Sequence, residues 1–596
     1  MPTPEGAILV ANCSGFYGDR LAAAREQVEG GDIDYLTGDW LAELTMLILA
    51  RTRAGGRGGG WARTFLTQME QVLGTCLDRG IKVVSNAGGL DPAGCAGAVQ
   101  ELAAKLGLAP RIAYVAGDDL VPRLAQLQAA GIHFNNLDTG ESLTDKGVEV
   151  ITANAYLGCW GIAEALDRGA DVVVAGRVTD AAVVMGPPAH AFGWSRTDWD
   201  RLAGACVAGH VIECGAQATG GNYSFFTEVP GMDYLGFPIA EVFPDGSSVI
   251  TKHAGTGGQV SIGTVTSQLL YEIGSPQYFN PDVVCRFDTI TLEELGPDRV
   301  RISATRGEPA PPTLKVAMNY QGGFRNGFTF CLTGLDIEEK AALLQRQIWA
   351  SFPEGAEHFE QARVQLLRTD KENPGSNEEG TALLKFTVKD HDERKVGRSF
   401  ANAAVEIGLA SIPGFYGLSG APGPASPYGV YWPALIPADL VAQEVVLLGE
   451  GATTVDNTPG GLVGAPVDPA PVPLSAAAES RAPGREPTVS VPLGKLFGAR
   501  SGDKGGNANV GLFARSAAAY AWLEQFLTVE RMQHLLPDAA GLEIRRYLLP
   551  NIWSVNFVIV GLLEEGVAAS SRQDGQAKSL GEYVRAKLVD LPEVLL

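Results

Sequence analysis

The sequence predicts an α/β protein with three parts: an N-terminal core built on a parallel sheet, an α+β extension, and a C-terminal ferredoxin-like α+β domain. Three observations predict this organisation. Short apolar runs alternate with helical patterns over residues 6–205, strand-like alternation dominates residues 206–455, and a compact mixture of strand and helix patterns fills residues 488–596. Strands separated by helices of ordinary length favour parallel βαβ units.

Five apolar runs are expected to form the parallel sheet of residues 1–205, because strands buried on both faces read as continuous apolar segments. They cover residues 7–11, 81–84, 111–115, 148–151 and 171–175. A helix is expected over about 93–106. Ligands of open α/β sheets bind beyond the carboxyl ends of the strands. The polar residues at these ends are Asn12, Ser14, Asn86, Asp118, Asn154, Arg177, Thr179 and Asp180.

Those polar strand ends have two interpretations. Turns select Asn, Asp and Gly for their backbone geometry alone, so one polar end carries little information. Five polar ends rich in Asn and Asp favour a binding site. No G-x-G-x-x-G follows any of the strands, which gives little support to a dinucleotide cofactor.

Residues 206–455 are expected to form the α+β extension with an antiparallel sheet, because runs such as 299–303 and 328–332 alternate like strands. Two polar motifs lie in this part. Residues 209–223 contain His210, Glu213 and Asn222, and residues 250–258 contain Lys252, His253 and Thr256. His210 and Glu213 share one face of a helix, which suits acid/base work or a metal pair, whereas a satisfied buried pair is the alternative. A cation and an imidazole beside glycines fit oxyanion or phosphate stabilisation, and an exposed turn is the alternative.

Residues 456–487 are rich in Pro, Ala and Gly and show no apolar periodicity, so they predict an extended linker. The domain that follows is expected to be ferredoxin-like. Its predicted elements are a strand at 488–497, a helix at 512–527, strands at 542–549 and 553–562, and a helix at 579–589.

The run Gly498–Gly511 holds five glycines together with Arg500, Asp503, Lys504 and Asn507. Glycine lets a ligand approach the main chain, and amides at a helix start attract anions. We therefore expect a loop that holds an anionic ligand and completes a pocket of the N-terminal region, in the same chain or in a neighbouring subunit of a homo-oligomer. A charged strand-to-helix turn is the alternative. The run lacks the glycine spacing and the Ser/Thr of a P-loop.

Composition excludes several classes of protein. The net charge of −22 and the pI of about 4.8 argue against partners such as nucleic acid or an anionic membrane. The N-terminus has no cationic region, and its apolar run is too short for a signal peptide core or a membrane span. Eight dispersed Cys without a CxxC pair fit reduced thiols. A cytoplasmic location is therefore expected.

Five segments together resemble one known family. Residues 12–20, 170–180, 209–222, 251–263 and 498–511 are similar to the acyclic terpene utilisation (AtuA-like) proteins, over nearly the whole chain. The resemblance implies a large N-terminal region followed by a small ferredoxin-like domain. It also implies a role beside enzymes that degrade citronellol, geraniol and related branched acids as CoA thioesters. It carries over no catalytic residues.

The function expected from residues and resemblance together is catalysis on a branched or terpenoid acyl-CoA, by hydration or another lyase-type step through an enolate. Such a step needs a base near the α-carbon and donors at the thioester oxygen. The candidate catalytic residues are His210, Glu213, His253 and Asp180. The candidate ligand-binding residues are Asn86, Asp118, Asn154, Arg177, Asn222, Lys252, Thr256, Arg500, Asp503, Lys504 and Asn507.

Several alternatives stay open at this stage. The acid could be released by hydrolysis or activated with ATP, or the chain could be a non-catalytic scaffold of the same pathway. Cys13 could act as a nucleophile if a following helix lowers its pKa. No cofactor is indicated beyond the CoA part of the substrate, and a Mg²⁺ site is left open because no HExxH, paired-His or CxxC pattern occurs. An enzyme would be favoured over a scaffold if five of the candidate residues converged on one site. These are Asn86, Arg177, His210, His253 and Lys504.

The division into parts leads to a first prediction. Limited proteolysis should cut between residues 456 and 487, because exposed linkers of small residues are preferred sites of cleavage. Mass spectrometry of the fragments would locate the cut. Resistance of this segment, together with cuts inside residues 90–180, would contradict the division.

Overall fold

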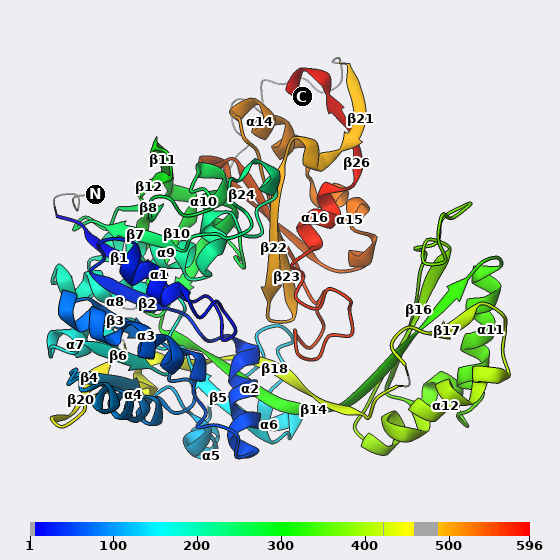
Figure 1. The fold of residues 1–596 in the computed structure, drawn as a ribbon, viewed down its shortest axis with the longest axis horizontal. Coiled ribbons are helices and arrows are strands. Elements are labelled where there is room, and N and C mark those ends of the chain that lie inside the picture. The colour runs from blue at the N-terminus through cyan, green and yellow to red at the C-terminus, as the bar shows by residue number, and fades with distance from the viewer. Residues whose placement is uncertain (1–5, 421, 458–486) are drawn as a thin grey trace. The chain divides into compact units, whose positions relative to one another are not determined.

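A computed structural model describes residues 6–420, 422–457 and 487–596 of the chain (Figure 1). The protein forms two compact units. The larger unit comprises the described residues within Met1–Asn319, Tyr431–Val567 and Gln576–Leu596, and the smaller unit comprises those within Tyr320–Val430 and Ala568–Gly575. Apart from its first two residues and its last one, the linker expected at 456–487 lies outside the described residues.

Five parallel strands form the centre of the main sheet in the larger unit, and four of them coincide with apolar runs of the sequence. Their order is β1 (Ile8–Asn12), β2 (Tyr35–Gly38), β3 (Lys82–Ser85), β6 (Val172–Ala175) and β4 (Ile112–Ala116). The strand β2 has only four residues, and the apolar runs of the sequence do not reveal it. All residues of β2 and β6 are buried, which is typical of parallel strands covered on both faces.

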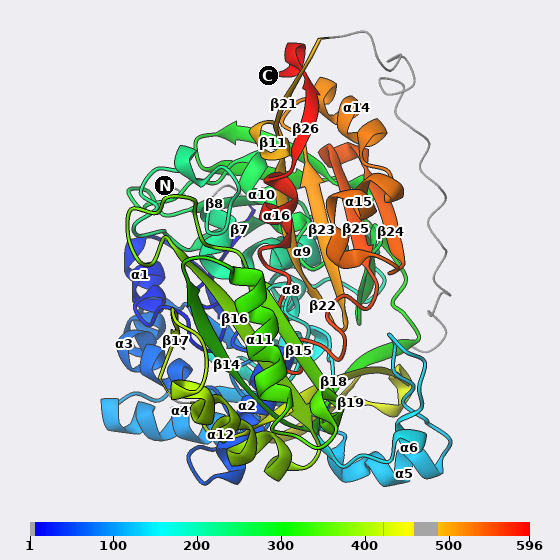
Figure 2. The same cartoon turned by 90° about the vertical axis from the view of Figure 1, so that its right-hand side faces the viewer.

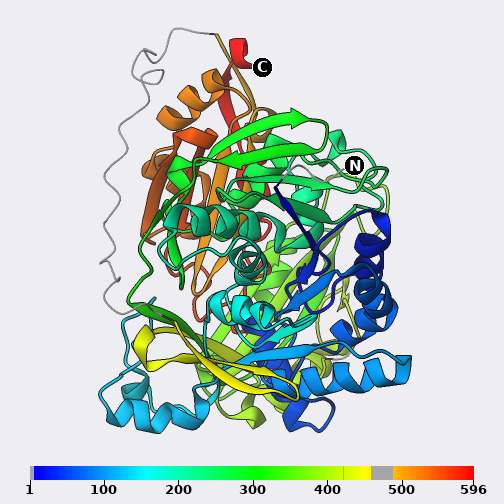
Figure 3. The same cartoon turned by 90° about the vertical axis from the view of Figure 1, so that its left-hand side faces the viewer.

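Antiparallel strands extend this sheet on both sides. Beyond β1 lie β7 (Pro238–Val242), β8 (Ser248–Lys252), β12 (Arg299–Ser303) and β11 (Thr291–Gly296). Beyond β4 lie β19 (Ala442–Leu447) and β20 (Gly451–Asp456), drawn in yellow in Figure 3. A separate small sheet pairs β9 (Gln277–Asn280), β10 (Val283–Arg286) and β13 (Arg306–Glu308).

The helices of this region begin and end as their local sequences dictate. Helix α4 starts at Pro92, where the Asp91 carboxylate accepts a hydrogen bond from the Gly94 amide, and stops at Gly107 with a φ of +72°. None of the helices in the described parts of the chain is both long enough and apolar enough to cross a membrane. The helices are α1 (Ala23–Gly30), α2 (Glu43–Ala54), α3 (Arg63–Arg79), α4 (Pro92–Leu106), α5 (Leu124–Ala129), α6 (Leu143–Lys146), α7 (Trp160–Asp167), α8 (Ala182–Ala191), α9 (Trp199–Ile212) and α10 (Ile262–Leu269).

The strand β5 (Val150–Ala155) is not in the parallel sheet, in contrast to the prediction from its apolar start. It pairs with the long strand β14 (Thr313–Thr333). The reason lies in its polar second half. Thr152 accepts a hydrogen bond from Asn319 of β14, and Asn154 donates one to Asp118, so both buried polar side chains find partners there.

The C-terminal part of the larger unit has its own hydrophobic core and a four-stranded antiparallel sheet, ordered β22, β23, β25, β24 (Figure 2). The strands are β22 (Gly498–Lys504), β23 (Asn507–Phe513), β24 (Ile544–Leu549) and β25 (Ser554–Ile559), with a second pair β21 (Thr488–Pro492) and β26 (Leu588–Pro592). The helices are α14 (Ala517–Phe526), α15 (Val529–Leu535) and α16 (Leu580–Arg585).

The run Gly498–Gly511 forms a β-hairpin rather than the expected loop at a helix start. Seven residue pairs join β22 to β23, and α14 begins only at Ala517 with Ser516 as its cap. The glycines are explained by close packing. A Cβ atom on Gly502 would lie 2.8 Å from the ring of Tyr271, and one on Gly511 would lie 2.8 Å from Leu270. Only Gly505, at the turn, has a positive φ of +65° within this run.

The smaller unit is an antiparallel sheet covered by two helices. It contains β15 (Gln361–Leu367), β16 (Thr381–Asp390) and β17 (Phe415–Gly417), together with parts of β14 and β18 (Ser426–Pro437). The helices α11 (Ile337–Trp349) and α12 (Phe400–Glu406) contribute to a core rich in phenylalanine. Phe328, Phe386 and Phe400 meet at ring-centroid distances of 4.9–5.0 Å.

The packing of the hairpin predicts an asymmetric response to added methyl groups. Gly502→Ala should destabilise the protein by about 1–3 kcal/mol, because a Cβ there would lie 2.8 Å from both Glu272 and Tyr271. Gly97→Ala is the matched control, because no atom lies within 4 Å of its Cβ position on α4, and it should stabilise the helix by up to about 1 kcal/mol. Melting temperatures of the two variants would check this, and equal shifts would show that the hairpin does not pack tightly.

Candidate functional site

A group of charged side chains gathers inside the larger unit, beyond the carboxyl ends of β2, β3 and β6. We call it the charged cluster. Electrostatic interactions link each of its members to at least one other member. Its carboxyl groups belong to Asp39, Glu43, Asp180, Glu213, Glu272 and Asp503, and its cations to Arg177, Lys315, Lys504 and Lys578.

Three neighbouring parallel strands deliver part of the cluster, as expected for an open α/β sheet. Asp39 directly follows β2, Asn86 directly follows β3, and Arg177 and Asp180 follow β6. Asn86 links two of these strand ends, because its amide donates to Asp39 Oδ1 at 2.5 Å and its Oδ1 accepts from the Trp40 amide at 2.8 Å. Asn86 therefore orients Asp39.

Arg177 is the most deeply buried cation of the cluster, with 1% of its side chain exposed. Its Nη1 donates to Asp180 Oδ1 at 2.6 Å, and its guanidinium lies 4.1 Å from the ring centroid of Tyr156. Nε has no hydrogen-bond partner among the described residues. A buried charge needs such pairing, and Asp180 supplies it while keeping 30% of its own side chain exposed.

Asp118 and Asn154 hold the backbone beside Arg177. One carboxylate oxygen of Asp118 accepts from the Arg177 amide at 3.0 Å and from Asn154 Nδ2 at 2.7 Å. Burial raises the pKa of Asp118 to about 6, although these two hydrogen bonds favour the ionised form. Both residues therefore position Arg177.

Lys315, Glu43 and two tyrosines form the next part of the cluster. Glu43 Oε1 lies 3.3 Å from Lys315 Nζ, and it accepts hydrogen bonds from Tyr156 at 2.7 Å and from Tyr431 at 3.4 Å. Burial opposes ionisation of Glu43, but Lys315 and Arg177 outweigh it and lower the pKa below its ordinary value. Glu43 is thus the carboxylate of the cluster that stays charged most easily.

Other carboxyl groups of the cluster are held in the neutral form near pH 7. Burial and then the neighbouring Asp180 raise the pKa of Asp39 to about 8. Burial and then Glu272 raise the pKa of Asp503 to about 8. The pKa of Glu43 is therefore lowered, whereas the pKa values of Asp39 and Asp503 are raised. Such a separation of pKa values is typical of acid/base sites.

His210 and Glu213 lie together, as the helical spacing predicts. His210 Nε2 donates to the Gln268 carbonyl at 3.0 Å, so its Nδ1 faces Glu213 Oε1 at 3.7 Å. Burial first and Lys504 second lower the pKa of His210 to about 4, and burial first and Asp180 second raise the pKa of Glu213 well above its usual range. Both shifts favour the neutral form of each group, and Nδ1 of His210 has no hydrogen-bond partner among the described residues.

The hairpin β22–β23 brings side chains of the C-terminal domain to the cluster. Lys504 Nζ donates to the carbonyl of Glu272 at 2.9 Å, and the Glu272 amide donates to Asn509 Oδ1 at 3.0 Å. These bonds hold Glu272 at a φ of +54°, a left-handed conformation that is unfavourable for a residue with a Cβ. Lys578, which precedes α16, donates to the Tyr271 hydroxyl at 2.5 Å.

Two other predicted hairpin residues make structural contacts instead. Arg500 is 4% exposed, donates to Gln217 Oε1 at 2.5 Å and lies 4.2 Å from the ring centroid of Tyr271. Asn507 donates to Asp138 Oδ1 at 2.7 Å and accepts from the Gly561 amide at 2.8 Å. Both side chains dock the hairpin onto its surroundings.

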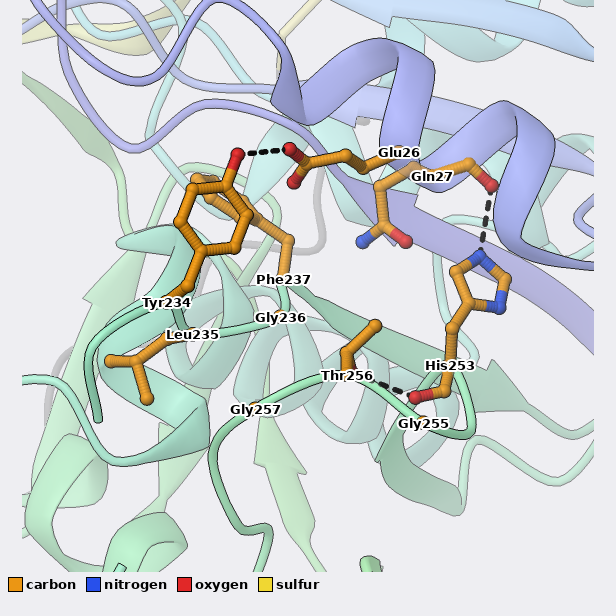
Figure 4. Close-up of a pocket in the computed structure, with 10 residues that line it drawn as sticks. All are labelled: Glu26, Gln27, Tyr234, Leu235, Gly236, Phe237, His253, Gly255, Thr256 and Gly257. Carbon is orange, nitrogen blue, oxygen red and sulfur yellow. Dashed lines mark hydrogen bonds between the residues drawn. The ribbon is translucent and has the colours of Figure 1, made fainter. Parts of the chain in front are cut away.

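The remaining predicted residues lie away from the cluster. His253 and Thr256 line a cavity of about 390 Å³ together with Glu26, Gln27 and Tyr234 (Figure 4). His253 Nε2 is 2.8 Å from the Gln27 carbonyl, and Lys252 binds the Thr256 carbonyl at 2.8 Å and pairs with Asp298 at 3.1 Å. Asn222 is an exposed residue with a φ of +57°.

Five members of the charged cluster are absent from the sequence prediction. Asp39 follows the short strand β2. If that strand had been recognised in the sequence, the strand-end rule that identifies Arg177 would have identified Asp39 as well. Glu43 begins α2, which follows the same strand. The other three carry no local signal, because their positions depend on distant contacts of β14, the α10–β9 segment and the C-terminal domain. They are Glu272, Lys315 and Lys578.

Nucleophile and metal chemistry receive no support from the geometry. Burial, followed by Cys76 and Asp19, raises the pKa of Cys13 well above its ordinary value, which opposes the thiolate required for attack. Among the described residues, no group of three or more His, Cys, Asp or Glu is arranged to hold a metal ion.

The raised pKa of Asp39 predicts a pH-dependent effect of its replacement. The folded protein keeps the Asp39 proton up to about pH 8, whereas the unfolded chain releases it near pH 4, so this residue makes stability fall as pH rises between these values. Asp39→Asn cannot titrate and should therefore gain melting temperature relative to wild type between pH 5 and pH 8. The exposed Asp145→Asn variant serves as control. A difference that does not change with pH would contradict the neutral state of Asp39.

Two models of one known family together match nearly the whole chain. Residues 8–447 match the acyclic terpene utilisation family protein AtuA, and residues 491–590 match the AtuA ferredoxin-like domain. No curated protein and no solved structure gives a significant match. The chain belongs to the AtuA family, and its C-terminal domain is ferredoxin-like, as the sequence motifs indicate.

Proposed function

We propose that this member of the acyclic terpene utilisation family is an enzyme of branched or terpenoid carboxylic acid catabolism, and that it acts on an acyl-CoA at the charged cluster. The proposed reaction is hydration or another lyase-type step through an enolate. One observation carries the proposal: Asp180, partly exposed and paired with Arg177, shares the cluster with carboxyl groups of raised pKa and with several ammonium groups. The proposed setting is the cytoplasm, which suits the free thiols of the chain.

The cluster offers a group for each part of a hydration. Asp180 takes a proton from water while the water oxygen bonds to the β-carbon of an unsaturated acyl-CoA, and the displaced electron pair moves to the thioester oxygen. The ammonium group of Lys578 interacts with Asp503 and Glu272 and supplies positive charge for that enolate oxygen. The protonated Asp503 then donates its proton to the α-carbon.

His210 and Glu213 support this chemistry indirectly, through their interactions with the carboxyl groups of the cluster. Both residues are buried, their pKa shifts favour the neutral forms, and Glu213 interacts with both Asp39 and Asp180. Loss or gain of the Glu213 proton would change the charge next to Asp180. We therefore assign to the pair the role of holding the proton balance of the site rather than contacting the reacting carbon.

Incubation with a panel of branched acyl-CoAs, with and without Mg-ATP, followed by mass spectrometry tests the proposal. A gain of one water supports hydration. Release of free acid and CoA would replace it by hydrolysis, and consumption of ATP with a free acid would replace it by acid activation. Absence of both turnover and binding would favour a scaffold protein of the same pathway.

The role of Asp180 gives a specific prediction. Asp180→Asn should lower kcat at least about 100-fold while KM changes little, because the amide cannot accept the proton of water. The exposed Asp145→Asn variant should retain the wild-type rate. Retention of wild-type kcat by Asp180→Asn would remove Asp180 from the mechanism. Circular dichroism of each variant separates loss of chemistry from loss of fold.

A further inference from the structure

Two lysines of the cluster, Lys315 and Lys504, come from different parts of the chain, and Tyr431 links their surroundings: its ring lies 5.6 Å from Lys315 Nζ, and Gly505, next to Lys504, packs toward it. Lys315 lies on β14, and Lys504 ends β22 of the ferredoxin-like domain. Burial first and the charge of Lys315 second lower the pKa of Lys504, so like charges are held close enough to repel. Proteins keep such a pair when an anion joins it or when the surroundings force it.

The contacts of Lys315 leave part of its ammonium group available. Its Nζ lies 3.3 Å from Glu43 Oε1, 4.9 Å from the ring centroid of Tyr156 and 5.6 Å from that of Tyr431. One carboxylate oxygen and two ring faces surround it, and 34% of the side chain is exposed. An ammonium group has three donors, and Glu43 accounts for one.

The contacts of Lys504 are fewer. Its Nζ donates to the Glu272 carbonyl at 2.9 Å and lies 5.6 Å from the ring centroid of Tyr278. It forms no ion pair with any described residue, and although the surrounding protein desolvates its ammonium group, the residue still reaches solvent. Two of its donors are therefore free for a ligand.

The turn of the hairpin places Lys504 near the surroundings of Lys315. The turn residue Gly505 packs toward Tyr431, since a Cβ atom on it would lie 3.6 Å from Cε1 of that ring. Tyr431 is the same side chain whose ring faces Lys315 and whose hydroxyl binds Glu43. Asp138 fixes the turn by accepting from the Gly506 amide at 2.9 Å and from Asn507 at 2.7 Å.

We propose that one anionic group of the substrate, a carboxylate or a phosphate, binds between Lys315 and Lys504 and thereby joins the ferredoxin-like domain to the core. The identity of the ligand as substrate rests on the proposed function. Free donors on both ammonium groups fit an oxygen-rich anion, and an anion removes the repulsion between them. Charge-assisted contacts of this kind fix orientation, so the two lysines place the acyl group relative to Asp180.

Binding of inorganic phosphate at constant ionic strength, measured by calorimetry and by the shift in melting temperature, tests the site without turnover. Wild type should bind phosphate and be stabilised by it. Wild type should bind one phosphate per chain at this site, and Lys315→Gln and Lys504→Gln should each weaken that binding at least 10-fold because both lysines hold the same anion, with the double variant weaker than either. Lys504→Arg should restore binding. The exposed Lys495→Gln of the same domain should bind like wild type.

Several outcomes would overturn the proposal. Unchanged phosphate affinity in both single variants would exclude the site, and two phosphates per wild-type chain, with one of them lost in each single variant, would indicate two separate anions. Wild-type turnover of an acyl-CoA by both single variants would leave the proposed function standing and remove this site. Phosphate binding with the expected losses in the variants, but without turnover of any acyl-CoA, would support the anion site and remove the proposed function.

Competition against phosphate identifies the source of the anion. Displacement by 3-methylglutarate but not by CoA assigns it to a second carboxylate on the acyl chain. Displacement by CoA alone assigns it to a phosphate of the CoA part. Failure of both to displace bound phosphate would separate the anion site from the substrate and contradict the proposal.

Discussion

The buried guanidinium of Arg177 is the constraint on which the charged cluster depends. A charge that is 1% exposed is strongly unfavourable unless it is paired and hydrogen-bonded. The chain meets this need with acids and amides at strand ends: Asp180 binds the guanidinium, and Asp118 binds the backbone amide of the same residue. Removal of either partner would leave a charged or polar group without compensation, so the strand ends β4 and β6 are tied to each other through Arg177.

An excess of carboxyl groups around one arginine has a consequence for protonation. Several carboxylates within one buried region cannot all ionise, so some must keep their protons. Glu43 remains ionised because Lys315 and Arg177 lie close to it, while Asp39 and Asp503 stay neutral near pH 7. The cations Lys504 and Lys578 come from the ferredoxin-like domain, so the balance of charge in the cluster depends on both parts of the larger unit. A protein with a net charge of −22 gathers its cations here locally.

The sequence is sufficient to predict the parallel core, the ferredoxin-like domain and the strand-end residues Asn86, Arg177 and Asp180, because these follow from local patterns and one topological rule. It is insufficient for Lys315 and Lys578, whose importance comes only from tertiary contacts. The glycines of 498–511 show the limit of composition as an argument. Glycine permits both a ligand-binding loop and a tightly packed hairpin, and the sequence does not show that Tyr271 and Leu270 lie against Gly502 and Gly511.

The unfavourable features of the cluster bear on the choice between an enzyme and a scaffold. Glu272 keeps a left-handed backbone, Lys315 and Lys504 repel each other, and Nδ1 of His210 and Oε2 of Glu213 have no hydrogen-bond partner among the described residues. Each feature lowers the stability of the fold, and a scaffold would gain nothing from any of them. Strain and unpaired polar atoms persist where a ligand or a reaction uses them. Their concentration in one cluster, at the carboxyl ends of parallel strands, therefore favours a site that binds and converts a small anion.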